Sequence, residues 1–182
     1  MKEALYYEKK AQQKTACYLC PHNCQIAEAK RGICNVRINQ GGTLYTENYE
    51  VVSGFHFDPV EKKPVYHYYP GKIILSVGSL GCNFKCKFCQ NWEIAQCTVP
   101  EYGFRRTFSV KNIVEQAQEK NSNIGIAYIY NESIVWYEFM YDKSGQKIQE
   151  LVPLFSKGST IRERIHEDSF YGAIKQTDEK DE

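Results

Sequence analysis

The sequence lacks any long hydrophobic run. No apolar stretch approaches the ~20 residues that a membrane-spanning helix needs, so no membrane partner is expected. The first 14 residues, MKEALYYEKKAQQK, are charged and contain no apolar segment of the kind found in secretory signal peptides. These absences predict a cytoplasmic protein whose cysteines stay reduced.

The sequence also lacks an excess of charge of one sign. Lysine and arginine number 23 against 22 aspartates and glutamates, which gives a formal net charge of +1. Nucleic-acid-binding surfaces usually carry a clear basic excess, so no nucleic-acid partner is expected.

The 182 residues are also too few for a closed (β/α)₈ barrel, which takes ~250 residues and rarely fewer than ~200.

Cysteine, in contrast, is abundant. Seven of the eight cysteines fall into two groups, at 17–34 and at 82–89, and only Cys97 stands apart. In a cytosolic protein, clustered cysteines indicate metal binding or catalysis and not disulfides. Residues 15–35 contain few long apolar side chains, so we expect a small module that a metal orders.

The remaining pattern predicts an α/β fold. Two compact apolar runs, 72–78 and 124–130, are typical of buried strands in a parallel sheet. Between them, Ser109 is the expected N-cap of a short helix that ends near Asn121. Residues 134–141 resemble the start of a second helix, so the order favours a parallel sheet. Residues 41–69 predict small strands and loops.

The sharpest motif is a C-x3-C-x2-C loop directly after the first of these strands, formed by Cys82, Cys86 and Cys89. A closed zinc or iron–sulfur site takes four ligands, whereas three thiolates leave one iron of a cubane open to a small molecule. Zinc is the alternative, but its usual spacing pairs two C-x2-C units. Cys97 could supply a fourth thiolate, although packing as a free thiol is the simpler interpretation.

This loop, with Phe88 before its third cysteine and a strand ahead of it, resembles the radical S-adenosylmethionine (SAM) superfamily. Longer stretches resemble one branch of it, the proteins similar to pyruvate formate-lyase activating enzyme and most closely the radical SAM member of the AmmeMemoRadiSam system. These stretches are CYLCPHNC at 17–24, RGICNVR at 31–37, DPVEKKPVYH at 58–67 and GIAYIYNE at 125–132.

The resemblance implies that Cys82, Cys86 and Cys89 bind a [4Fe–4S] cluster whose fourth iron binds the amino and carboxylate groups of SAM. An electron donor such as flavodoxin or ferredoxin would supply one electron. SAM is then cleaved to methionine and a 5′-deoxyadenosyl radical, which abstracts hydrogen from a protein or small-molecule substrate. The expected activity is an oxidoreductase chemistry of the activating-enzyme type. In such enzymes the cofactor carries out the reaction, and the protein binds and orients the cofactor and the substrate.

The resemblance also implies three contacts with SAM. The backbone of Phe88 matches the position that lies near the adenine. Asn131 and Glu132 match a segment that contacts the SAM ammonium, where a carboxylate gives a charge-assisted hydrogen bond. Without the resemblance, Glu132 is simply an acidic residue at the start of a helix, which the helix dipole favours.

The N-terminal cysteines supply a second set of thiolates, formed by Cys17, Cys20, Cys24 and Cys34. Four thiolates suit either zinc or a second iron–sulfur cluster, and ligand softness does not choose between them. His22 is an alternative ligand, although a single histidine in a loop is more often solvated.

These predictions divide the chain into a Cys-rich module of strands and loops at 1–70, the first two βα units of a partial radical SAM barrel at 71–141, and a divergent tail at 142–182. The tail contains one helical pattern at 146–154 and does not resemble the family, so we expect a truncated member. The alternative function is a non-catalytic iron–sulfur or zinc-binding protein. The charged stretch 58–63 is either a solvated loop or a segment near the barrel mouth.

Overall fold

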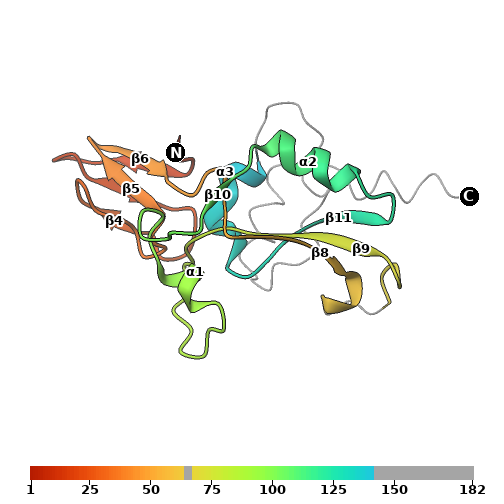
Figure 1. Ribbon diagram of the computed structural model, residues 1–182. Helices are drawn as coiled ribbons and strands as arrows, with labels where there is room; N and C mark the ends of the chain where they lie inside the picture. The colour runs from red at the N-terminus through yellow and green to blue at the C-terminus, as the bar shows by residue number, and fades with distance from the viewer. Residues whose placement is uncertain (64–66, 142–182) are drawn as a thin grey trace, which may run out of the picture.

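The longest strands form a three-stranded sheet at the centre of the fold (Figure 1). In the computed structural model, which describes residues 1–63 and 67–141, β9 (Ile73–Gly78) is the middle strand. It pairs in parallel with β11 (Asn123–Tyr128) and antiparallel with β8 (Gly54–Pro59). The two strands predicted from their apolar runs are therefore confirmed, as is their parallel pairing.

Helix α2 (Val110–Gln118) covers one face of this sheet (Figure 1). Its apolar residues Ile113, Val114 and Ala117 pack with the β9 and β11 side chains in one buried cluster. Ser109 caps the helix as predicted, because its hydroxyl accepts a hydrogen bond from the backbone amide of Asn112. The spacing of apolar residues thus determined both the helix and the face that it buries.

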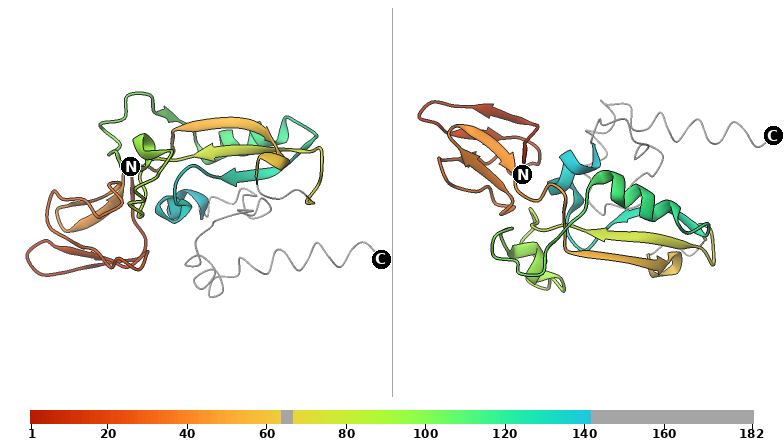
Figure 2. Two further views of the ribbon diagram at one scale, coloured as in Figure 1. Left: turned by 90° about the horizontal axis from the view of Figure 1, so that it is seen from below. Right: turned by 45° about the horizontal axis from the view of Figure 1, so that its top comes forward.

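The N-terminal residues form two further three-stranded antiparallel sheets, to one side of the central sheet (Figure 2). The first contains β1 (Lys2–Glu3), β6 (Thr43–Thr46) and β5 (Arg37–Gln40). The second contains β2 (Tyr7–Lys9), β3 (Thr15–Cys17) and β4 (Gln25–Ile26). A short ribbon joins β7 (Val51–Val52) and β10 (Arg106–Thr107).

Short helical turns complete the described chain. They are the 3-10 helices η1 (Val60–Lys62) and η2 (Ser133–Trp136) and the α-helices α1 (Trp92–Gln96) and α3 (Tyr137–Met140). The helix expected at 134–141 is therefore two short turns, because the chain changes from 3-10 to α geometry at Tyr137. Both views of Figure 2 place α3 between the N-terminal sheets and the central sheet.

The central sheet crosses the expected domain boundary at 70/71. Strand β8 lies before this boundary, and all six of its residues pair with β9, which lies after it. Among the described residues the architecture is mixed α/β with several small sheets and few helices, and the partial barrel remains a prediction. None of the described helices is long and apolar enough to cross a membrane. The expected divergent tail, with its helical pattern at 146–154, lies outside the described residues.

Candidate functional site

The three-cysteine loop begins directly after β9. Cys82 is buried, Cys86 is exposed and Cys89 is intermediate, so the loop runs from the core to the surface. The backbone amide of Phe84 donates to Cys82 Sγ at 3.4 Å, and the amide of Cys89 donates to the Cys86 carbonyl at 3.2 Å. The three thiols therefore belong to one surface loop with an anchored first ligand.

Gly81 makes the turn that starts this loop. Its φ of +81° lies in the left-handed region, and a Cβ there would come within 2.5 Å of both the Cys34 carbonyl oxygen and Val36 Cγ1. The Gly81 amide donates to the Ile94 carbonyl at 2.9 Å, which ties the loop to α1. Only glycine satisfies both the backbone angle and the close approach of the N-terminal module.

The segment after β11 lies beside this loop. Asn131 donates through Nδ2 to Ser79 Oγ at 2.9 Å and to the Gly81 carbonyl at 2.5 Å. Asn91 Nδ2 donates to the Tyr130 carbonyl at 3.0 Å. The two Asn131 bonds join the carboxyl ends of β9 and β11, where α/β folds commonly build ligand sites, and the Asn91 bond ties the start of α1 to the same place.

Glu132 is the N-cap of η2, and its Oε1 accepts a hydrogen bond from the Ile134 amide at 3.3 Å. Burial raises the pKa of this carboxyl above its ordinary value, which the Ile134 amide opposes. Burial also raises the pKa of the Cys82 thiol; backbone amides of Phe84 and Glu132 oppose the shift, whereas the negative charge of Glu132 adds to it. The carboxylate and the first loop cysteine are thus close enough to act on each other.

The loop fits an iron–sulfur cluster in the chemistry of its donors. It supplies three thiols and has an exposed edge, as a cluster with one open iron requires. Within the described part of the chain, no three His, Cys, Asp or Glu side chains already form a group that could hold a metal. The thiols would therefore have to turn toward a common point on binding. Phe88 is 90% exposed on the same loop.

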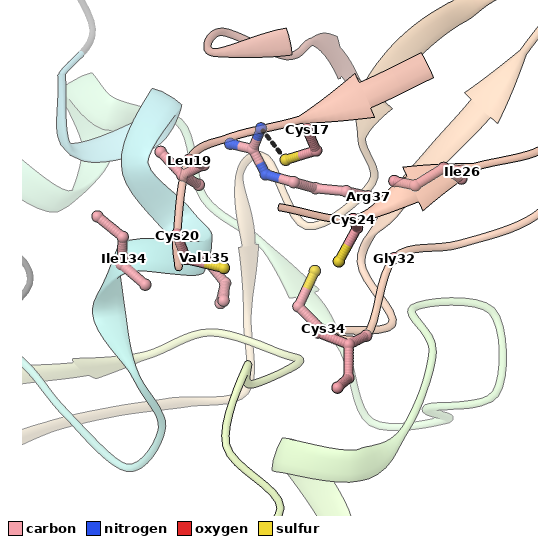
Figure 3. A pocket seen from close by; sticks show the side chains of 11 residues that line it. Cys17, Leu19, Cys20, Cys24, Ile26, Gly32, Cys34, Arg37, Ile134 and Val135 are labelled. Carbon is pink, nitrogen blue, oxygen red and sulfur yellow. Dashed lines mark hydrogen bonds between the residues drawn. The ribbon is translucent and has the colours of Figure 1, made fainter. Parts of the chain in front are cut away.

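The four N-terminal cysteines line one small pocket (Figure 3). Cys17 ends β3, and Cys20, Cys24 and Cys34 come from the turns that follow β3 and β4. In Figure 3 their sulfur atoms face a common space beside Arg37, Ile134 and Val135. All four are free thiols, and the structure places the second predicted ligand set around one pocket. Within the described residues no three of them yet form a group that could hold a metal, so they would have to move closer together on binding.

Two of these thiols are held in their protonated form by their surroundings. Burial raises the pKa of Cys34 to about 11. Burial also raises the pKa of Cys17, against the opposing positive charge of Arg37. Because metals bind thiolates, an incoming ion would displace these protons.

The other predicted ligands lie elsewhere. His22 is not among the pocket-lining residues, and its Nε2 is 2.8 Å from the Asn83 carbonyl oxygen. Cys97 packs against the core cluster that contains Cys17 and Cys34, and its thiol donates to the Ile94 carbonyl at 3.5 Å. The packing interpretation of Cys97 therefore agrees with its position.

Sequence reasoning missed a buried ion pair at the same pocket. Arg37 Nη2 donates to Glu138 Oε1, and the two side chains are only 2% and 1% exposed. Arg37 Nη1 also reaches the Leu5 carbonyl at 3.0 Å and Cys17 Sγ at 3.9 Å. The two residues are 101 positions apart, so no local pattern signals the pair.

The charged stretch 58–63 is tied to the central sheet. Asp58 accepts hydrogen bonds from Ser76 Oγ at 2.7 Å and from Lys63 Nζ at 2.9 Å. Burial alone would raise the pKa of Asp58, but bonds from Lys63, Ser76 and Lys62 outweigh it and lower the pKa to about 2. The segment therefore has a structural role beside the paired strands β8 and β9.

Comparisons with known proteins identify relatives without describing a function. No protein-family model matches the chain, and no solved structure matches it. Uncharacterized protein MJ0808 of Methanocaldococcus jannaschii is 44% identical over 144 residues, which are 79% of this chain and 43% of that protein. Uncharacterized protein MJ0674 of the same organism is 30% identical over 91 residues, 47% of this chain and 22% of that protein. The chain thus spans less than half the length of these relatives.

Proposed function

We propose that the chain is a radical SAM protein of the activating-enzyme type, with the candidate site at the carboxyl ends of β9 and β11. The observation that carries the proposal is the meeting of two kinds of chemistry there. An open loop of three thiols follows β9, and a half-buried carboxylate, Glu132, follows β11 close to Cys82. In sheets with parallel strands, this edge is the usual place for a cofactor.

Cys82, Cys86 and Cys89 would hold a [4Fe–4S] cluster. When bound, such a cluster supplies the single electron that cleaves SAM. The chain's own contribution is placement: Cys82 is anchored by the Phe84 amide, and Asn131 holds the Gly81 carbonyl, so the start of the loop keeps a constant position relative to β11.

Glu132 would bind the ammonium group of SAM. Its burial disfavours the ionised carboxylate in the free protein. A cation placed beside it would reverse that effect, since opposite charges favour each other's ionised forms, and the hydrogen bond formed would be charge-assisted. The backbone at Phe88 would contact the adenine.

The exposure of the three-cysteine loop supports a proposed protein partner that donates the electron. Cys86 is exposed, so a protein electron donor such as flavodoxin or ferredoxin has direct access to this part of the loop. The substrate would be a protein or a small molecule.

The test is anaerobic reconstitution of the chain with iron and sulfide, followed by EPR spectroscopy of the reduced protein with and without SAM. We expect a cluster signal whose g-values change when SAM is added, because SAM would bind the open iron. A cluster signal that does not respond to SAM would contradict the proposal.

That second result would favour the alternative, a non-catalytic iron–sulfur or zinc-binding protein. One observation supports this alternative. Among the described strands, β11 pairs only with β9, so within the described residues no further parallel strand continues the sheet as a fuller barrel would.

A further inference from the structure

The N-terminal pocket has the composition of a closed metal site, and its thiols would close around an ion on binding, because no three of them form a metal-holding group in the described structure. Four thiols and one guanidinium are its polar groups, and its other lining residues are apolar or glycine, among them Leu19, Ile26 and Ile134. Gly32 lies against the pocket wall, because a Cβ there would come within 3.2 Å of Ile26 Cδ1 and into ordinary contact with Cys24 Sγ at 3.6 Å. Free thiols are weak hydrogen-bond partners, so an apolar pocket that gathers four of them is better explained by a metal than by a hydrogen-bonded network.

The size of the pocket favours a single ion. The space between the side chains is about 10 Å³, which is roughly the room for one water-sized sphere. A cubane of four irons and four sulfides is much larger than one atom. Four thiolates around a single ion are the usual tetrahedral ligand set of structural zinc.

We propose that Cys17, Cys20, Cys24 and Cys34 bind one zinc ion, and that this ion holds in position the two segments that form the candidate site, residues 81–97 and 132–140. Binding replaces four S–H bonds with four Zn–S bonds and releases four protons to solvent. No oxidant or reductant is needed. The resulting site carries net negative charge, which the guanidinium of Arg37, 3.9 Å from Cys17 Sγ, partly offsets.

Residues next to the proposed zinc ligands contact the first segment, residues 81–97. His22 lies between Cys20 and Cys24 in the chain and contacts the Asn83 carbonyl at 2.8 Å. Asn35, which follows Cys34, donates through Nδ2 to the Gln96 carbonyl at 2.7 Å. The Cys34 carbonyl itself lies against Gly81. Movement of the ligands would therefore move both ends of the segment 81–97, namely the start of the three-cysteine loop and the end of α1.

The second segment contributes to the pocket directly. Ile134 and Val135 line it, and Arg37 at its edge pairs with Glu138. Ile134 is also the residue whose amide donates to Glu132. The pocket thus adjoins the turn that presents the candidate SAM-binding carboxylate.

The first experiment measures metal content by elemental analysis of the full chain purified after expression with zinc and iron. The variant Cys82→Ala/Cys86→Ala/Cys89→Ala lacks the other ligand set, so its metal reports on the N-terminal pocket alone. We expect one zinc per chain in this variant and in Cys97→Ser, and none when Cys24→Ser is added. About four irons with sulfide, no bound metal in the triple variant, or zinc retained after Cys24→Ser would overturn the zinc site.

The second experiment tests the positioning effect by hydrogen exchange. His22→Ala/Asn35→Ala keeps every ligand, and we expect it to retain zinc while amide exchange at 81–97 becomes at least tenfold faster. Exchange at 110–128, which contains α2 and β11, should stay unchanged and serves as the internal control. Unchanged exchange at 81–97, or equal acceleration in both regions, would overturn the positioning role.

This inference does not rest on the proposed function. Zinc content and hydrogen exchange are measured in chains without an iron–sulfur cluster and without SAM. A failure of the EPR test would leave the zinc site standing, and loss of the zinc site would leave the SAM response to be judged separately.

Discussion

The chain places its two cysteine groups in different environments. The N-terminal thiols gather in a pocket beside a buried ion pair, whereas the thiols of the 82–89 loop extend from a buried Cys82 to an exposed Cys86. Four donors of which two are buried and none is exposed suit a closed structural site, and three donors of which one is exposed suit a centre that must meet another molecule.

The sharpest way to break this comparison is to remove one thiol from the exposed loop. We expect Cys86→Ala to abolish the SAM-responsive cluster, because each of three ligands is needed when no fourth is present. Cys97→Ala is the matched control and should keep the cluster. EPR after reconstitution measures both, and equal loss in the control would indicate a closed four-thiolate site.

The next largest effect is expected at the ion pair beside the pocket. Glu138→Gln should lower the free energy of unfolding by about 3 kcal/mol, because it leaves the buried Arg37 charge without its partner. Glu47→Gln is the control, since the Arg31–Glu47 pair is 27% and 12% exposed and should be worth about 1 kcal/mol. Urea unfolding measures both values. Equal losses of unfolding free energy in the two variants would mean that burial does not increase the contribution of the Arg37–Glu138 pair to stability.

The contact between the two regions can be tested at Gly81. We expect Gly81→Ala to cost about 2 kcal/mol, since the new Cβ meets the Cys34 carbonyl and the φ of +81° is strained for alanine. Gly41→Ala has a similar φ of +62° with nothing within 4 Å, so it should cost only about 1 kcal/mol. The same unfolding assay applies, and the comparison fails if the two substitutions cost the same.

A smaller effect is expected from the carboxylate beside the exposed loop. Glu132→Gln keeps the shape of the side chain and removes its charge, so SAM affinity should fall by about tenfold, the equivalent of ~1.4 kcal/mol. Titration of the reconstituted protein with SAM, followed by EPR, measures the change. Unaltered affinity would show that Glu132 does not contact the ammonium, while the cluster itself could remain.

The smallest effect is expected in the central sheet, which belongs to neither cysteine group. The pKa of Asp58 is lowered to about 2 from 3.8, so the stability that it provides is fully present above pH 3.8 and is lost as the pH falls toward 2. After allowance for solvent screening, this is about 1 kcal/mol. The difference in unfolding free energy between wild type and Asp58→Asn should therefore shrink between pH 4 and pH 2. A constant difference would contradict the assignment.

The local elements were predictable because their signals lie within a few residues. The apolar runs determined β9 and β11, and the Ser109 cap with Ile113, Val114 and Ala117 determined α2. Strand β8 was not recognised as part of the same sheet, because its residues alternate weakly and its partner follows after a loop. Pairing between distant segments leaves little trace in local periodicity.

The sequence by itself determined the candidate ligands of this protein: two sets of thiols at fixed spacings, three in one loop and four near the N-terminus. Only the tertiary structure decided which set is enclosed and what each set contacts. Arg37 meets Glu138 across 101 positions, and Asn131 reaches the Gly81 carbonyl across 50. Spacing along the chain is set by covalent bonds, whereas burial and long-range pairing depend on how distant segments pack, and packing is a property of the whole fold.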